Sequence, residues 1–297
     1  MSHFKNKTAV ITGAGSGFGL EFARRAAALG MNVVMADIQA DALDAAHDEL
    51  RSTGARFEAH VVDVSDAAQV EALAVAATQT FGDVHLLFNN AGVGSGGLLW
   101  ESSVADWEWT LGVNLWGVIH GIRAFVPRML ASAAAAPHYR GHVVNTASMA
   151  GLLNPPLSGV YNVSKHAVVS LSETLYHDLS LVGEQVHCSV LCPYYVPTGI
   201  NRSYRNRPDT APTLTRSQRV AGAMTDKAVG SGRVSAAEVA AMTFDAVAEN
   251  RFYIASHPKA LEGVRKRADE IVSQHNPSDP FAARAGTRET LIDALRR

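Results

Sequence analysis

A tyrosine and a lysine four positions apart are the side chains best suited to chemistry in this sequence. Tyr161 and Lys165 share one face of a helix if residues 158–182 are helical, because side chains at i and i+4 lie one turn apart. An unperturbed phenol titrates near pH 10, too high for a base at neutral pH, but a neighbouring ammonium favours the phenolate. Lowering that pKa by about three units takes about 4 kcal/mol of differential interaction. The pair predicts an acid/base centre, although a YxxxK pattern also arises by chance.

A glycine-rich loop follows the first predicted strand and leads into a predicted helix. Its glycines let the backbone turn tightly, and the N–H groups at the start of the helix attract a diphosphate. The expected cofactor contacts come from Gly13, Ser16, Gly17, Phe18 and Gly19.

A second glycine pattern follows a later strand, at Gly92, Gly94 and Gly97. It lacks the acidic residue about twenty positions further on that accompanies a dinucleotide site. We interpret it as a loop whose glycines permit close approach of other backbone segments.

Two acidic residues stand at the ends of predicted strands. Asp37 follows the strand 31–36, where a carboxylate accepts both ribose hydroxyls of NAD and repels the 2′-phosphate of NADP. Neither Ser16 nor Ile38 supplies a positive charge for that phosphate, so we expect NAD rather than NADP. The alternative for Asp37 is a solvated strand end or helix cap. Asp63, with Val64 beside it, ends the third strand and is expected to contact adenine.

Composition narrows the function classes. The chain has 297 residues, of which 18% are charged, and its net charge of -2 disfavours nucleic acid as a partner. No N-terminal apolar core and no run of about 18 apolar residues occurs, so we expect a cytoplasmic protein without a membrane partner. Cys188 and Cys192 are expected to be reduced core residues. No metal site is expected, since His138 and His142 do not form a ligand motif.

Short β-branched segments alternate with longer helical ones along most of the chain. This alternation predicts an α/β fold of the doubly wound, Rossmann type, with about seven mostly parallel strands and helices on both faces. The predicted strands are 8–11, 32–35, 57–62, 85–88, 142–145, 186–191 and 252–255. The predicted helices are 18–29, 40–52, 66–81, 103–133, 158–182, 236–250 and 258–275.

One Rossmann-type domain, 1–297, is expected, with two additions. Residues 199–233 are rich in Arg, Pro, Gly, Ser and Thr, and they break the alternation. We interpret them as a mobile lid over the substrate without a long helix, the alternative being a surface excursion with no catalytic part. Residues 258–297 are expected to form a C-terminal helical appendage ending in a proline-containing tail.

Four motifs in order and in register resemble the short-chain dehydrogenase/reductase family over residues 5 to about 255. TGxxxGxG spans Thr12 to Gly19, and NNAG spans Asn89 to Gly92. The family's helix asparagine matches Asn114, and its serine matches Ser148, upstream of Tyr161 and Lys165.

The resemblance implies a role for each matching residue. Tyr161 would donate or accept the substrate proton, Lys165 would lower its pKa and hold the nicotinamide ribose, and Ser148 would position the substrate oxygen. Asn114 would hold a proton-relaying water. The remaining implied cofactor contacts are Asn90, Gly92, Val196 and Thr198.

The resemblance also implies an activity: hydride transfer between NAD and a secondary alcohol or ketone. Tyr194 replaces the glycine that usually follows the proline after the sixth strand, so the shape of the substrate site departs from the family. The apolar residues 149–157 with Tyr194 and Tyr195 predict a hydrophobic or aromatic small-molecule substrate, unless they only pack the loop. A homo-oligomer, dimer or tetramer, is expected. The alternatives are an NAD-binding protein without turnover and a lyase or epimerase on the same fold.

Overall fold

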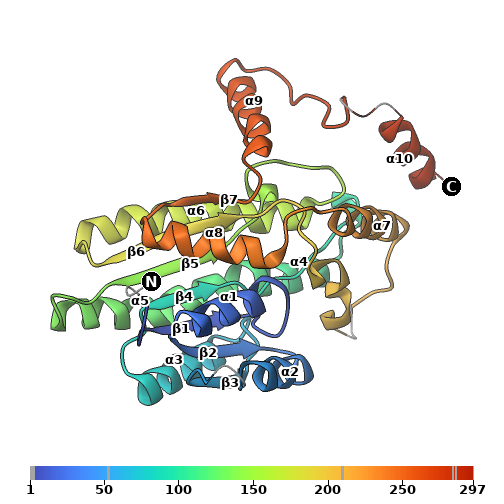
Figure 1. The fold of residues 1–297 in the computed structure, drawn as a ribbon. Helices are drawn as coiled ribbons and strands as arrows, with labels where there is room; N and C mark the ends of the chain where they lie inside the picture. Colours follow the sequence, from blue (N-terminus) through green and yellow to red (C-terminus); the bar gives the residue numbers. More distant parts are fainter. Residues whose placement is uncertain (1–3, 52–53, 209–210, 283, 285, 297) are drawn as a thin grey trace.

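A parallel β-sheet forms the centre of the molecule (Figure 1). The computed structural model describes residues 4–51, 54–208, 211–282, 284 and 286–296; the predicted lid and appendage thus include residues 209–210, 283, 285 and 297, which lie outside the described part. Within that part the strand order is β3-β2-β1-β4-β5-β6-β7. The strands are β1 (Thr8–Thr12), β2 (Asn32–Asp37), β3 (Phe57–Val61), β4 (Leu86–Asn89), β5 (Gly141–Thr146), β6 (Val186–Cys192) and β7 (Tyr253–Ala255).

Helices cover both faces of this sheet, which confirms the predicted doubly wound α/β fold. One face packs against α1 (Gly17–Ala28), α2 (Ala40–Arg51) and α8 (Ala236–Ala248). The other packs against α3 (Ala67–Phe81), α5 (Gly117–Ala135) and α6 (Gly159–Val182). Strand order reverses direction between β1 and β4, and ligands of open α/β sheets bind outside the carboxyl ends of the strands at such a point.

Aromatic stacking holds the first layer of helices to the sheet. Phe22 of α1 stacks on Phe88 of β4 with ring centroids 4.5 Å apart, and Phe88 meets Phe244 of α8 at 5.5 Å. All three side chains are fully buried. Burying each contributes about 1.5–3 kcal/mol, so α1 is held firmly where its N-terminus faces the carboxyl edge of the sheet.

The single helix predicted over 103–133 is divided into three parts. α4 (Val104–Leu111) leads into a π-helical turn, η2 (Gly112–Trp116), before α5 begins. A capping box between Ser103 and Asp106 starts α4. π-Turns are rare and frequent at functional sites, and this one carries Asn114. The apolar pattern does not distinguish a π-turn from an α-turn, so the sequence did not reveal the division.

The region after β6 contains more regular structure than its composition predicted. It holds a 3₁₀ segment, η4 (Gly199–Asn206), and a 15-residue helix, α7 (Arg216–Gly230), which starts with a capping box between Thr215 and Gln218. The expectation that no long helix occurs there was wrong. Glycines within and at the end of α7 concealed it, but its buried residues pack against the loop that follows β4.

The C-terminal segment extends away from the sheet (Figure 1). After the 3₁₀ turn η5 (Pro258–Ala260), α9 (Leu261–Val272) projects outward, and the chain then returns to α10 (Thr287–Arg296), which packs on α7. α10 replaces part of the tail that the sequence predicted. No helix in the described residues is both long and apolar enough to span a bilayer.

Candidate active site

A cleft of about 1250 Å³ opens at the carboxyl edge of the sheet. It runs from the glycine loop after β1, past the loops after β4 and β5, to the lid segment and the C-terminal helices. Most of the predicted site residues line it: Gly13, Ser16, Gly17, Phe18, Asp37, Asp63, Val64, Asn90, Gly92, Ser148, Tyr161, Lys165, Val196 and Thr198. Gly19 and Asn114 lie just behind its surface.

The glycine loop has the shape that a diphosphate requires. Gly13 and Gly17 have φ of +66° and +54°, a region that L side chains rarely adopt. A Cβ on Gly19 would lie 2.0 Å from the carbonyl oxygen of Gly13, so only glycine allows this turn. α1 begins at once with neither an acidic residue in its first turn nor a side-chain cap from Ser16. Its first N–H groups therefore remain available to an anion.

Asp37 connects the glycine loop with the end of β2. One carboxylate oxygen accepts a hydrogen bond from the backbone N–H of Gly15 at 2.9 Å, and the other accepts from the N–H of Gln39 at 3.0 Å. The carboxylate is half-buried and lines the cleft. Each oxygen keeps a lone pair for a ribose hydroxyl. The residues of this end therefore fit the adenosine and diphosphate of a dinucleotide.

Asp63 and Asn90 are held mainly by internal hydrogen bonds. Asp63 accepts from the N–H and the hydroxyl of Ser65, at 2.9 and 2.7 Å. The amide of Asn90 donates to the Thr12 carbonyl at 3.0 Å and accepts from the Thr146 hydroxyl at 3.3 Å. Asn90 thus ties together the ends of three strands, and both residues shape the cleft wall.

The predicted proton-transfer residues converge from three elements. Lys165 of α6 is buried, and its ammonium donates to the Thr146 carbonyl of β5 at 2.8 Å. Its Nζ lies 5.7 Å from the ring centre of Tyr161. The Ser148 hydroxyl accepts from the N–H of Ala150 at 3.1 Å and donates to the Pro193 carbonyl at 3.4 Å.

Asn114 is fully buried in the π-turn behind these residues. Its amide accepts from the Val93 N–H at 2.8 Å and donates to the Val93 carbonyl at 3.0 Å and the Ser164 hydroxyl at 3.1 Å. A Cβ on Gly92 would lie 3.4 Å from the Asn114 oxygen and 3.6 Å from the Lys165 nitrogen. The glycine therefore leaves space between Asn114 and Lys165.

Burial has the largest effect on the pKa values of Tyr161 and Lys165. It raises the pKa of the Tyr161 phenol to about 12, against the opposing effect of a hydrogen bond with Ser148. It lowers the pKa of Lys165 to about 8. Loss of hydration thus outweighs the hydrogen bond with Ser148, and the pKa of Tyr161 lies above its ordinary value.

The segment that follows β6 shapes the other side of the cleft. Thr198 lies over the glycine loop, and its Cβ would be 3.2 Å from a Cβ on Gly17. The rings of Tyr194 and Tyr195 lie 4.6 Å apart, and the N–H of Tyr194 donates to the hydroxyl of Ser256 at 3.1 Å. The ring of Tyr194, packed against Tyr195, thus stands where the family has a glycine.

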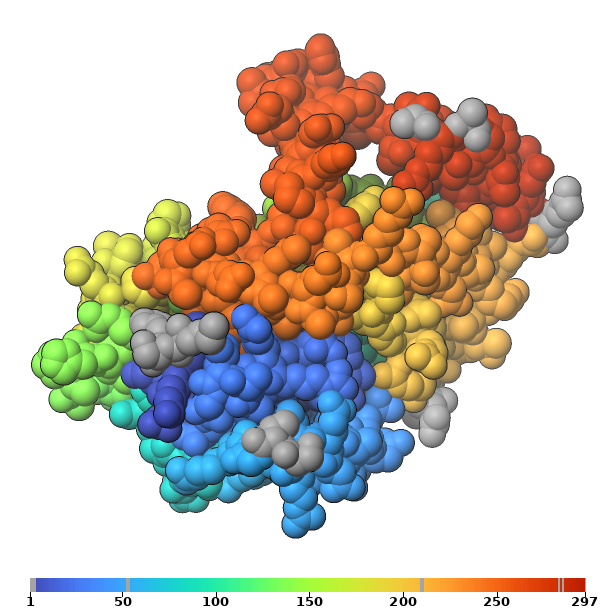
Figure 2. Space-filling model, in the orientation of Figure 1, coloured from blue at the N-terminus to red at the C-terminus, as the bar shows by residue number. Residues whose placement is uncertain are grey.

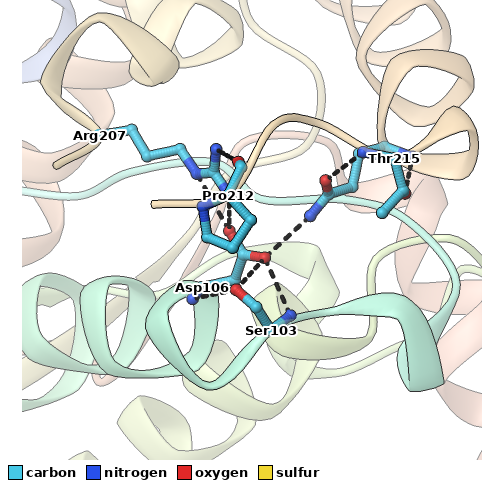
Figure 3. A network of polar contacts seen from close by, with 6 residues as sticks. Ser103, Asp106, Arg207, Pro212 and Thr215 are labelled. Carbon is cyan, nitrogen blue, oxygen red and sulfur yellow. Dashed lines mark hydrogen bonds and ion pairs between the residues drawn. The ribbon is translucent and has the colours of Figure 1, made fainter. Parts of the chain in front are cut away.

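Sequence reasoning missed the buried ion pair that anchors the lid. Asp106 at the start of α4 accepts from Nε and an Nη of Arg207, at 3.1 and 2.6 Å, and from the Gln218 amide at 3.0 Å (Figure 3). Burial raises the Asp106 pKa, but hydrogen bonds from Arg207 and Ser103 hold it below its usual value. The partners lie about a hundred positions apart in the chain, and no local pattern connects them.

Arg205 was likewise missed. It lies on η4, and its Nε donates to the side chain of Gln39 at 3.0 Å, while an Nη donates to the carbonyl of Gly199 at 3.2 Å. It connects the lid with the loop that follows Asp37. The only available signal was the excess of arginine between 199 and 233.

The second glycine loop packs against the lid, as expected of glycines that permit close approach. The N–H of Gly94 donates to the hydroxyl of Ser203 at 2.9 Å. A Cβ on Gly97 would lie 2.8 Å from Cγ of Gln218. This loop therefore supports the lid rather than a second phosphate.

Comparison with known proteins identifies the fold and the family. A family model described as short chain dehydrogenase matches residues 7–209. A crystal structure of a short chain dehydrogenase/reductase from Burkholderia phymatum in complex with NAD is 54% identical, with a TM-score of 0.91, over 95% of this chain and 100% of that one.

Two characterised relatives match over most of their length. The 1-deoxy-11-beta-hydroxypentalenate dehydrogenase of Streptomyces exfoliatus is 36% identical over 91% of this chain and 90% of its own. The C alpha-dehydrogenase of a Sphingobium strain is 31% identical over 96% of this chain and 92% of its own.

Proposed function

The chain belongs to the short-chain dehydrogenase/reductase family and is an oxidoreductase acting on CH–OH groups; on that premise we propose that it interconverts a secondary alcohol and a ketone with NAD, using Tyr161 as acid and base. The observation that carries this proposal is the convergence of Ser148, Tyr161 and Lys165 on the same cleft as the glycine loop and Asp37. When bound, NAD accepts or supplies the hydride.

Each residue of the site has a distinct task in this proposal. Ser148 holds and polarises the substrate oxygen, and Tyr161 takes its proton in oxidation or returns it in reduction. Lys165 stabilises the phenolate and binds the nicotinamide ribose. Asn114, fully buried next to Gly92, holds a water that passes protons between Lys165 and solvent.

The cofactor contacts support NAD as the preferred dinucleotide. Asp37 lines the cleft at the end of β2 and would repel a 2′-phosphate at close range. We assign adenine to the wall formed by Asp63 and Val64, the nicotinamide end to Val196 and Thr198, and the diphosphate to the loop Gly13–Gly19. The neighbour from Burkholderia phymatum was crystallised with NAD.

The substrate side supports an apolar or aromatic alcohol. Met149, Leu153, Pro155 and Pro156 line the cleft beside Tyr194 and Tyr195. We further propose a homo-oligomer, because Trp116 and Val163 expose about half of their apolar side chains around α5 and α6. A cytoplasmic location remains part of the proposal. Light scattering of the purified protein tests the oligomer.

A cofactor-matched substrate screen tests the activity. The protein is mixed with NAD or NADP and a panel of aliphatic and aryl secondary alcohols, and NADH or NADPH is followed by its near-ultraviolet absorbance. We expect NADH to accumulate, with NAD preferred over NADP. Binding of NAD without any accumulation would support a non-catalytic binding protein or an enzyme that uses NAD transiently.

A further inference from the structure

The C-terminal arm, residues 258–296, is attached at both ends to one loop of the active site. At one end, Gly263 of α9 lies on Leu153, whose Cδ atoms would be 3.5 Å from a Cβ at that position. At the other end, Leu291 of α10 is buried with Leu157 and Ala221. Leu153 and Leu157 both lie between Ser148 and Tyr161 in sequence. The arm therefore spans the substrate side of the cleft.

The arm encloses space rather than filling it. Figure 2 shows a notch between α9 and the remainder of the arm, above the body of the molecule. Residues of α9 and of the segment that follows it line the same cleft as the catalytic residues. The side chains of the arm therefore form part of the wall on the substrate side of the cleft.

Charged side chains make up much of this outer wall. Lys266, Arg267 and Glu270 line the cleft from α9, and Asp279 and Arg284 line it from the segment beyond. The two carboxylates have cationic partners: Glu270 lies 4.0 Å from Lys266, and Asp279 lies 3.1 Å from Arg288. The negative charge of each of these two carboxylates is therefore already balanced by a neighbouring cation.

Two guanidinium groups are left without such a partner. Among the described residues, no carboxylate lies within 4.0 Å of Arg267 or Arg284. Arg267 is half-buried on the side of α9 that carries Gly263 and Glu270, so it faces the cleft rather than open solvent. An unpaired guanidinium in a cleft is a ready partner for an anion, and its planar fork matches a carboxylate.

Arg284 lines the cleft with an exposed side chain. Burial raises the pKa of the Tyr195 phenol, and the charge of Arg284 acts in the opposite direction. Tyr195 in turn is near enough to Tyr161 to influence its pKa. The cleft wall thus includes both the aromatic side chain of Tyr195 and the cationic side chain of Arg284.

We propose that Arg267 and Arg284 bind a carboxylate at the end of the substrate remote from its carbinol, so that the substrate is an apolar hydroxy acid or the matching keto acid. This inference rests on the proposed dehydrogenase function and adds the substrate class.

Matched acids and esters test the proposal. The probes are secondary hydroxy acids whose hydroxyl and carboxylate are separated by short, medium and long methylene chains, each beside its methyl ester. We expect one chain length at which the wild type has about tenfold higher kcat/KM for the acid than for the ester, mostly through KM, and a preference that shrinks as salt is added.

Single variants assign the effect to the two arginines. Arg267→Gln and Arg284→Gln should each lower kcat/KM for that acid by about five- to tenfold and leave the ester within about twofold. Arg265→Gln is the matched control, since Arg265 is exposed on the same helix and does not line the cleft. Calorimetric binding of a saturated carboxylate of the same length, with NAD present, should weaken in the same two variants only.

Two results would overturn the inference. One is a wild type that oxidises acid and ester equally well at every chain length. The other is an equal loss in Arg265→Gln, which would indicate a general effect of net charge. In both cases the oxidation of neutral alcohols with NAD still stands, whereas a wild type that oxidises no alcohol would contradict the proposed function itself.

Discussion

The two ends of the cleft are built in different ways. At the cofactor end, the wall is backbone and partly buried side chains at the ends of β1, β2 and β4, which are adjacent strands of one sheet. At the substrate end, the wall comes from the loop after β5, the lid and the C-terminal arm, which are far apart in sequence and carry exposed charged residues.

Tolerance to change differs accordingly. A Cβ on Gly19 at the cofactor end would strike the Gly13 carbonyl, whereas Gly222 and Gly230 in α7 have nothing within 4 Å of the same added atom. Close backbone packing at one end holds a common cofactor, and the exposed charged side chains at the other can vary with the substrate. The predictions below test this division, beginning with the largest effect.

Replacing Tyr161 with Phe should separate chemistry from cofactor binding. The phenol is the only proposed proton donor to the substrate, and acid–base catalysis is typically worth about 10² to 10⁴ in rate. We expect kcat to fall at least hundredfold while the Kd of NAD, followed by fluorescence titration, stays within about twofold. A variant that kept a tenth of the wild-type kcat would show that Tyr161 is not the acid/base.

Replacing Arg207 with Met should destabilise the substrate end. It leaves the Asp106 carboxylate, 5% exposed, without its cation, and breaking a buried pair costs about 3–5 kcal/mol. A control is Arg251→Met, whose pair with Glu249 is exposed and worth at most about 1 kcal/mol. Thermal melts should show a larger drop for Arg207→Met, and similar drops would contradict the role of the buried pair.

The pair of Asp106 and Arg207 also predicts that the stability of the fold depends on pH. Because the pKa of Asp106 is lower in the folded protein than in the unfolded chain, its contribution is present above the unfolded value and is lost as pH falls through the folded one. The difference in Tm between the wild type and Arg207→Met should therefore be smaller near pH 3 than at neutral pH.

Replacing Asp37 with Ala should weaken discrimination at the cofactor end. The variant removes the charge that opposes a 2′-phosphate, so we expect the ratio of kcat/KM with NAD to that with NADP to fall about tenfold or more. Because Asp37 also accepts from Gly15, the affinity for NAD should fall as well. Equal wild-type kcat/KM values for the two cofactors would contradict the assignment.

The rates of oxidation and reduction should change with pH in opposite directions, because each needs a different protonation state of Tyr161. Oxidation needs the phenolate and should rise with pH, whereas reduction needs the neutral phenol and should fall over the same range. Since the chain's own residues, with burial as the largest cause, put the pKa of Tyr161 at about 12, a lower apparent pKa at saturating NAD measures the effect of the cofactor's charge. Profiles with the same slope in both directions would exclude this scheme.

Limited proteolysis should show the smallest, conformational difference. The lid touches the cofactor end through the exposed bond between Arg205 and Gln39, and the buried pair at Arg207 anchors it beyond that point. We expect tryptic cleavage at Arg202 and Arg205 to slow several-fold when NAD and a substrate analogue are bound together. Unchanged cleavage rates would make the segment a surface excursion and leave the Tyr161 chemistry intact.

The sequence by itself determined the sheet, its helices and the cofactor end of the site. Strand residues such as Val10 and Val33 form continuous apolar runs, and the glycine loop and Asp37 follow their strands directly, so each motif is marked by the strand that it follows. The fold class and the family, both predicted from these local patterns, were confirmed. Local patterns suffice where each element is positioned by its own hydrogen bonds and one buried face.

Only the tertiary structure decided the substrate end. The π-turn at Asn114, the helix α7, the pair between Asp106 and Arg207 and the position of the C-terminal arm could not be read from periodicity. The contacts of Asn114 join positions 21 and 50 apart, and those of Asp106 with Arg207 and Gln218 join positions 101 and 112 apart. Polar residues reveal such contacts only after folding has brought them together. The unpaired charges of Arg267 and Arg284 became visible for the same reason: the structure shows which carboxylates lie within reach of each cation and which cations are left facing the cleft.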